Sequence, residues 1–329
     1  MAVFCAHVAQ CVGVREGDGL FMCLEAIGRF GVILFFVHTS LVLMCSMERS
    51  RHEPAFAVRF YVRRIFRIYP LAVAAVLCSY LCHIPPNAWS RLDFKPISLM
   101  QLMSNLFLVQ NVTQQKPILT VLWSLPLEVQ MYVVLPFLFI MVEALDWRRR
   151  LGMSFIAAGI AAMLVWNFTG RLNLFAFIPC FLSGVLAYKR MRHPRILPGW
   201  GWPLLVLIML VGLAVFPLYQ RHFLKPIGIL LEWSAAAILG FSWPMFREVS
   251  SKTVTVLAHQ IAKYSYGIYL THTYAMYLVF IHLKMSAVPG IALSFICTVV
   301  LSIAGYYLIE EPMINVGKYA AVRVGMKKN

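Results

Sequence analysis

Runs of mostly apolar residues, each about 16 to 22 residues long, recur along the whole chain and are separated by short polar segments. A helix needs about 20 such residues to cross the hydrocarbon core of a bilayer. The pattern therefore predicts an all-α polytopic membrane protein with about ten transmembrane helices in one bundle, a single membrane domain over residues 1–329. The predicted spans lie near residues 1–14, 28–47, 66–84, 121–145, 151–166, 172–188, 202–219, 226–245, 264–283 and 288–308.

The first predicted span, MAVFCAHVAQCVGV, is the weakest, because it is too short to cross a bilayer by itself. Either this span is short or the chain begins further upstream. The segment lacks the basic leader and small-residue cleavage site of a signal peptide, so we expect it to belong to the mature fold. We expect no soluble domain after the last span.

The composition excludes an ordinary soluble protein, because 61% of the residues are hydrophobic and 13% are charged, whereas soluble domains carry roughly 25% charged residues. The eight cysteines are scattered, with no CxxC pair and no His/Cys cluster at zinc spacing. We interpret them as small apolar packing residues, and we expect no metal site.

The positive charge gives the predicted spans a direction, because short cytoplasmic loops of membrane proteins are enriched in Lys and Arg. If both termini are cytoplasmic, the inner loops hold 20 of the 29 Lys and Arg residues. We therefore expect both termini on the cytoplasmic side. The net charge of +16 is then mostly orienting charge and attraction to anionic membrane lipid, and it does not indicate nucleic-acid binding.

Ionisable side chains inside a span cost a few kcal/mol, so those that persist usually face a cavity or a partner. They are the first places to look for chemistry. The residues of this kind at predicted intramembrane depth are His7, His38, Glu128, Glu232 and His272.

An arginine cluster stands at the inner edge of the third predicted span, in VRRIFRIYP (residues 62–70). On a helix, Arg59, Arg63, Arg67 and Arg64 project from one broad face. One interpretation is that they mark the membrane boundary and contact lipid phosphates. The other is a cytoplasmic site for a polyanionic ligand, because guanidinium groups pair bidentately with phosphate oxygens.

Glu128 lies between Pro126 and Pro136 in an otherwise apolar segment. Its carboxylate should face inward, either as a structural hydrogen-bonding group or as a proton acceptor or orienter of a histidine. His7 and His272 are each surrounded by apolar or aromatic residues. Taken singly, each is more often a core residue than a general base, although histidine is the usual base at neutral pH.

The order of these motifs resembles the acyltransferase 3 family of integral-membrane, acyl-CoA-dependent O-acyltransferases. The resemblance covers nearly the whole chain. It is carried by VFCAHVAQ with its histidine, the glycine-led GVILFFVHTSLVL, the arginine-rich FYVRRIFRIYPL, LWSLPLEVQMYVVLPFLF, YSYGIYLTH and IEEP, in that order.

The resemblance implies that His7 is the catalytic base and that Glu128 holds its imidazole and stabilises the imidazolium. It also implies that the RxxR pair Arg64 and Arg67, with Arg63 beside them, binds the phosphates of acyl-CoA, by default acetyl-CoA. The acceptor would be a sugar hydroxyl of a lipid-linked or surface glycan at a bacterial plasma membrane. Further candidates for the site are Trp123, Ser124, Tyr132, Tyr269, His272 and His38.

Two positions depart from the family pattern. Relatives usually carry an arginine about ten residues before the first histidine, and the chain starts too close to His7 to include it. Where relatives often read FF-x-x-Ser-Gly, this chain has Thr39 and Ser40 in place of Ser-Gly.

A proton-coupled transporter would also use intramembrane His and Glu. It predicts inverted repeats or paired broken helices, and the sequence has no convincing internal symmetry. A structural scaffold would not explain the family order of arginine, histidine and glutamate. Release of free coenzyme A thiol in the presence of an acceptor separates the enzyme from both alternatives.

Overall fold

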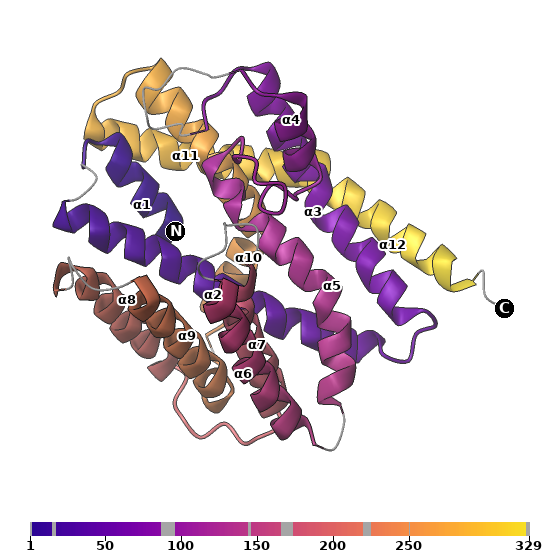
Figure 1. The fold of residues 1–329 in the computed structure, drawn as a ribbon. Coiled ribbons are helices and arrows are strands. Elements are labelled where there is room, and N and C mark those ends of the chain that lie inside the picture. The colour runs from indigo at the N-terminus through magenta and orange to yellow at the C-terminus, as the bar shows by residue number, and fades with distance from the viewer. Residues whose placement is uncertain are drawn as a thin grey trace. The chain divides into compact units, whose positions relative to one another are not determined.

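The computed structural model describes residues 2–14, 18–86, 96–143, 146–165, 174–219, 225–249 and 251–326. Apart from an isolated bridge between Leu197 and Phe246, the regular structure of these residues is helical, which confirms the all-α prediction. The helices (Figure 1) are α1 (Ala2–Cys11), α2 (Gly19–Ser50), α3 (Phe56–Leu81), α4 (Leu99–Leu106), η1 (Thr120–Trp123), α5 (Leu125–Val142), α6 (Trp147–Val165), α7 (Leu174–Arg190), α8 (Gly201–Tyr219), α9 (Lys225–Ser242), η3 (Trp243–Met245), α10 (Lys252–Met276), η4 (Tyr277–His282), α11 (Ala287–Gly305), η5 (Tyr306–Glu310) and α12 (Glu311–Met326).

Several helices can cross a membrane by their length and composition. Among the described residues, four segments qualify, and each overlaps a predicted span: Gly19–Ser50, Phe56–Leu81, Thr120–Val142 and Ala287–Val324. Helix α1, with 10 residues, is short, as expected. The predicted span ends at residues 1, 144–145, 166 and 172–173 lie outside the described residues.

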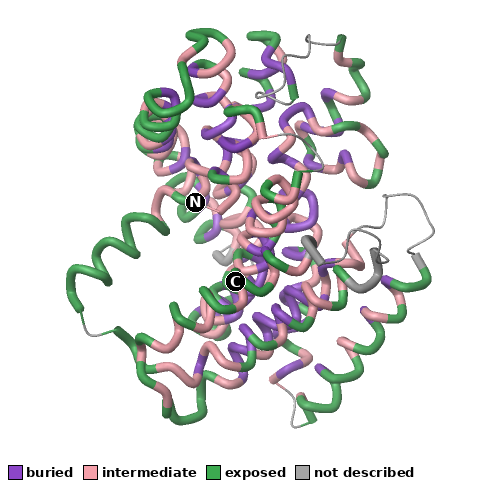
Figure 2. Tube along the Cα trace, turned by 90° about the vertical axis from the view of Figure 1, so that its left-hand side faces the viewer, coloured by how far each residue is buried: buried purple, intermediate pink, exposed green. Residues whose placement is uncertain are grey.

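The helices expose large apolar side chains as well as burying them. Buried and exposed stretches alternate along the tube in Figure 2. Phe137 is 69% exposed and Leu308 is 77% exposed. Extensive apolar surface is unfavourable in water but is compatible with lipid tails. The protein is therefore an integral membrane protein with several candidate spans.

Helix α3 begins earlier than the span predicted from residue 66. It starts at Phe56, directly after Ala55, which has a left-handed backbone conformation with φ 53°. Hydropathy marks the apolar part of a helix, but arginine is also a good helix former, so the helix continues into the charged segment. All the clustered arginines consequently lie inside α3, and Pro70 is also within it.

The described residues belong to two compact units, and neither is continuous in sequence. The first comprises Met1–Ala6, Glu16–Arg51 and Leu127–Ser251, and the second comprises His7–Arg15, His52–Pro126 and Lys252–Asn329. The first unit contains α2 and α6 to α9, with most of α5. The second contains α3, α4 and α10 to α12, with the end of α1.

In the first unit, α2 packs closely against α7 at a glycine. A Cβ atom on Gly184 would lie 2.2 Å from the carbonyl oxygen of Val37 and 2.5 Å from the Cβ of Ser40. Small residues let helix backbones approach in this way inside membranes. Ser40 stands where the family pattern has glycine, and here it is α7 that contributes the glycine to the contact.

Replacing Gly184 with leucine is expected to lower the melting temperature of the purified protein in detergent. The leucine side chain would clash with the backbone of α2, which cannot move aside without disturbing the helix. Overpacking of this kind typically lowers the free energy of unfolding by about 1–3 kcal/mol. Gly212→Leu is the matched control, because no described atom lies within 4 Å of its Cβ position. Unfolding is measured by tryptophan fluorescence. Equal melting temperatures for the two variants would show that the contact at Gly184 does not limit stability.

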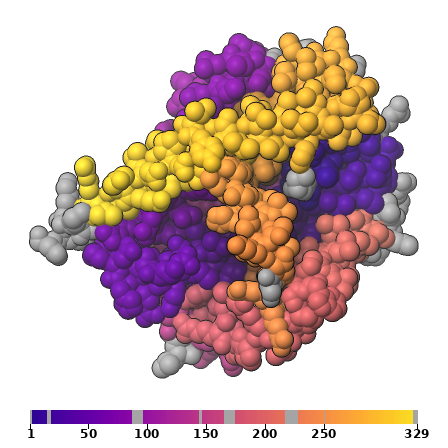
Figure 3. Space-filling model, turned by 180° about the vertical axis from the view of Figure 1, so that it is seen from behind, coloured from indigo at the N-terminus to yellow at the C-terminus, as the bar shows by residue number. Residues whose placement is uncertain are grey.

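In the second unit, α3 and α12 lie side by side (Figure 1), and α10 packs against α11. Figure 3 shows α12 in yellow on the face seen from behind. Helices α11 and α12 are joined through η5, a π-helical turn, into one apolar segment from Ala287 to Val324. The C-terminal segment therefore runs beside the helix that carries the arginines.

Candidate functional site

The clustered arginines of α3 are placed in the second unit against two carboxylates. Glu53 receives two of them: Arg59 donates from Nη1 to its Oε2 over 2.9 Å, and Arg63 Nη1 lies 3.6 Å from the same oxygen. Arg59 also donates to the backbone carbonyls of Ala321 and Val322 near the end of α12. A cation at the carbonyl end of a helix is favourable. Arg59 therefore has a structural role, tying α3 to α12.

Arg67 and Arg64, the predicted RxxR pair, are held differently. Arg67 Nη1 lies 3.6 Å from Oε2 of Glu310, the last residue of η5. The Arg64 guanidinium lies over the ring of Phe60, 5.9 Å from its centroid. The sequence predicted that these cations share a region of α3, but it did not identify Glu53 or Glu310 as their partners.

His7 and His272 lie together in the second unit, although they come from opposite ends of the chain. Their rings are stacked, with centroids 5.4 Å apart and an angle of 14° between the planes. Nδ1 of His272 donates to the carbonyl oxygen of Ile268 over 3.1 Å, because a carbonyl can only accept. In the neutral ring, Nε2 is then the basic nitrogen. Nδ1 of His7 contacts Oε1 of Gln10 over 3.3 Å, which leaves Nε2 of His7 as its basic nitrogen in the same way.

Hydroxyl groups extend this cluster. The rings of Tyr269 and His272 lie 6.2 Å apart. The Tyr269 hydroxyl is 2.7 Å from the carbonyl oxygen of Val121, to which it donates, and 2.8 Å from the Ser124 hydroxyl. Trp123 precedes Ser124 and ends η1. Four candidates, His7, His272, Tyr269 and Ser124, are therefore brought into one group of ring and hydroxyl contacts.

Glu128, Tyr132 and His38 belong to the first unit. Glu128 lies buried in the first turn of α5, where it accepts a hydrogen bond from the Tyr132 hydroxyl one turn further on. The His38 ring lies 5.7 Å from the ring of Trp243. The contact between Glu128 and the His7 imidazole stays a prediction, because these residues lie in different units.

Glu232, whose role the sequence left open, forms an ion pair with Arg29, which was not among the candidate residues. Arg29 donates from Nε to Oε1 of Glu232 over 2.7 Å, which joins α2 to α9. The pair borders a cavity of about 400 Å³, whose other walls include Phe30, Ile33 and Phe216. The only sequence signal was an isolated arginine close to an apolar run.

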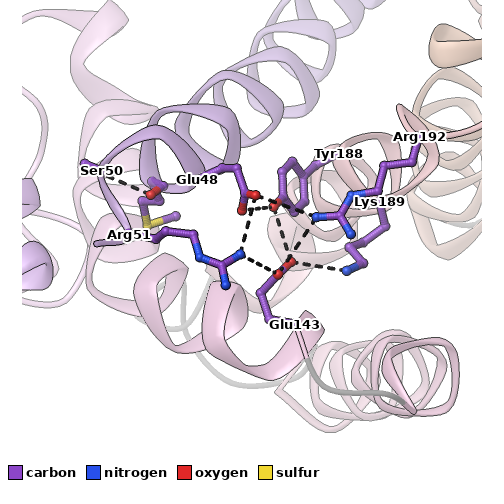
Figure 4. Close-up of polar contacts among 8 residues, drawn as sticks. Glu48, Ser50, Arg51, Glu143, Tyr188, Lys189 and Arg192 are labelled. Carbon is purple, nitrogen blue, oxygen red and sulfur yellow. Dashed lines mark hydrogen bonds and ion pairs between the residues drawn. The ribbon is translucent and has the colours of Figure 1, made fainter. Parts of the chain in front are cut away.

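A second charged cluster ties together the ends of α2, α5 and α7 in the first unit (Figure 4). The Tyr188 hydroxyl lies at its centre: it donates its single proton to Glu48 over 2.7 Å, and an oxygen of Glu143 lies 3.3 Å from the same hydroxyl. Three cations surround the two carboxylates: Arg51, Lys189 and Arg192. In the sequence, these basic residues counted only as charge that orients the spans in the membrane. In the structure they also form ion pairs. Within the described part of the chain, no group of three or more His, Cys, Asp or Glu side chains is arranged to hold a metal.

Comparison with known proteins gives consistent results. A family model described as an acyltransferase domain matches residues 1–310. The chain is also 23% identical over 317 residues to the exopolysaccharide production protein ExoZ of Rhizobium meliloti (strain 1021), covering 91% of this chain and 94% of that protein. No solved structure matches.

Proposed function

Because the chain belongs to the acyltransferase 3 family, we propose that it is a membrane-bound O-acyltransferase that moves an acyl group from cytosolic acyl-CoA to a sugar hydroxyl. Acetyl is the proposed acyl group. The observation that carries the proposal is the grouping, in one unit, of the His7 and His272 imidazoles with the arginine-bearing helix α3.

The proposed reaction is a single acyl transfer. The acceptor hydroxyl oxygen attacks the thioester carbonyl carbon while Nε2 of His7 takes the hydroxyl proton. The carbon–sulfur bond breaks, and the thiolate of coenzyme A leaves with a proton from the imidazolium. A positioned histidine base contributes roughly 100- to 10,000-fold to such a step. Glu128 is the proposed group that stabilises the imidazolium.

We assign the donor phosphates to Arg63, Arg64 and Arg67. Guanidinium forks match phosphate oxygens, and three of them on neighbouring turns of α3 suit a polyanion. The side chain of Arg67 is 29% exposed and that of Arg63 is 30% exposed, so both are accessible to a ligand. The alternative for these residues is contact with lipid phosphates at the membrane boundary.

The proposed setting is a bacterial plasma membrane crossed ten times, with both termini in the cytoplasm and the two units forming a single membrane domain. This places the start of α3 on the side where acyl-CoA is made. The acceptor is proposed to be a cell-surface or lipid-linked glycan. The ExoZ relative, named for exopolysaccharide production, supports this choice.

The test is to supply acetyl-CoA carrying a labelled acetyl group to bacterial membranes that contain or lack the protein. We expect protein-dependent release of coenzyme A thiol and transfer of label to the glycan fraction. A transporter or scaffold would produce neither. Label in lipid or protein alone would contradict the proposed acceptor while leaving acyl transfer in place.

Replacing Glu53 with glutamine is expected to lower the KM for acetyl-CoA. Glu53 is 40% exposed and lies 3.6 Å from Arg63 as well as pairing with Arg59, so it competes with a phosphate for Arg63. Exposed ion pairs are worth about 0.2–1 kcal/mol, which corresponds to a decrease of roughly 1.4- to 5-fold. The decrease in KM should become smaller as salt is added, because salt screens the interaction between exposed charges.

Glu248→Gln is the matched control for this change, because Glu248 is an exposed glutamate that pairs with Arg195 over 2.7 Å and with none of the arginines of α3 among the ion pairs of the described residues. Its KM should equal that of the wild type. A KM that rises in Glu53→Gln would show that Glu53 organises the arginines rather than competing for them.

A further inference from the structure

Glu310 is a carboxylate enclosed by the second unit and facing a functional cation. Its side chain has 0% exposure, and within the described residues no donor makes a hydrogen bond to either carboxylate oxygen. Arg67 is the ion-pair partner, with Nη1 at 3.6 Å from Oε2. A buried carboxylate without hydrogen bonds costs several kcal/mol, so stability alone gives little reason to keep it.

Close packing of helices flanks Glu310 along the chain. It ends the π-helical turn η5, and such turns occur frequently at functional sites. On one side of it, a Cβ on Gly305 would lie 3.3 Å from Cδ1 of Leu71. On the other side, a Cβ on Gly317 would lie 2.6 Å from the Cβ of Phe66. The C-terminal segment and α3 therefore approach closely both before and after Glu310.

The ion pair with Glu310 does not cover the whole Arg67 side chain. One terminal nitrogen faces Glu310, whereas 29% of the Arg67 side chain is exposed. A planar fork held at one nitrogen loses less rotational freedom when another nitrogen binds a phosphate. Glu53 does not hold its arginines in this way. It is 40% exposed and can turn away from them.

We infer that Glu310 is a positioning residue, which holds the Arg67 guanidinium in the orientation that binds the phosphates of acyl-CoA. The inference rests on the proposed function, in which Arg67 binds the donor. It assigns opposite effects to the two carboxylates: removing the exposed Glu53 improves donor binding, and removing the buried Glu310 weakens it.

The test uses the full-length protein in lipid nanodiscs, with coenzyme A binding measured by calorimetry and the KM for acetyl-CoA measured by thiol release in membranes. Glu310→Gln should weaken coenzyme A binding and raise the KM by about tenfold, with a smaller change in kcat. Glu310→Asp keeps the charge and should restore part of the affinity. Glu311→Gln, at the neighbouring position, is the matched control and should bind like the wild type.

A double variant shows whether Glu310 acts through Arg67. In an Arg67→Ala background, Glu310→Gln should cause no further loss of coenzyme A binding. The coenzyme A affinity is calculated for the folded fraction of each variant, as judged by gel filtration. If Glu310 only stabilised the fold, the affinity of that fraction would not change. Wild-type affinity in Glu310→Gln, or equal losses with and without Arg67, would overturn the inference. A wild-type protein that neither binds coenzyme A nor releases thiol would overturn the proposed function as well.

Discussion

Replacing His7 with alanine is expected to lower acetyl transfer by about 100- to 10,000-fold at unchanged protein level. The reason is that Nε2 of His7 is the proposed acceptor of the hydroxyl proton, and alanine has no group to replace it. Donor binding should persist, because the arginines of α3 are untouched. The measurement is the initial rate of label transfer from acetyl-CoA in membranes, together with coenzyme A binding to the purified variant.

His193→Ala serves as the control for His7→Ala, because His193 is exposed in the segment after α7 and is not among the candidate residues. It should retain wild-type activity. If His7→Ala is equally active, the base lies elsewhere, and His272, whose ring stacks on His7, is the next residue to replace. Loss of coenzyme A binding in His7→Ala would instead indicate a disturbed fold.

The double replacement of Arg64 and Arg67 with alanine is expected to raise the KM for acetyl-CoA by about 10- to 100-fold. Each hydrogen bond to a charged group is worth about 1.5–3 kcal/mol, and the two losses need not add. The double Lys variant keeps the charge but not the planar fork, so it should recover only part of the affinity. The measurement is KM and kcat from thiol release at several salt concentrations.

Arg150→Ala is the matched control for these arginines, because Arg150 is 44% exposed and pairs only with Asp146 one turn earlier among the contacts of the described residues. Its KM should not change. If all these variants keep the wild-type KM, α3 contacts lipid phosphates and the donor binds elsewhere. A fall in kcat alone would place the arginines at the reacting thioester rather than at the phosphates.

The sequence predicted the local features of this protein well. Apolar runs located the helices, because a bilayer demands long stretches of apolar residues with satisfied backbone groups. The spacing of Arg59, Arg63 and Arg67 placed them on neighbouring turns, because an α-helix has 3.6 residues per turn. The start of α3 at Phe56 was not predicted, because hydropathy marks the membrane and not the end of a helix.

The pairing of distant side chains was not predictable from the sequence. In a soluble helix, an apolar stripe shows which face turns inward, but in a membrane both the lipid-facing and the packed faces are apolar. Nothing in the pattern around His7 therefore indicated His272, and nothing around Arg67 indicated Glu310. Arg29 and Glu232 are a third such pair.

The sequence by itself thus determined the helical class, the membrane setting, the family resemblance and the types of residue available for chemistry. These depend on composition and on short-range spacing, which the chain carries in every conformation. The tertiary structure decided which of those residues meet: His7 with His272, the hydroxyls of Tyr269 and Ser124, and Arg67 with the buried Glu310. Such contacts depend on the rotation and close approach of helices, which are set by side-chain packing over the whole unit rather than by any local pattern.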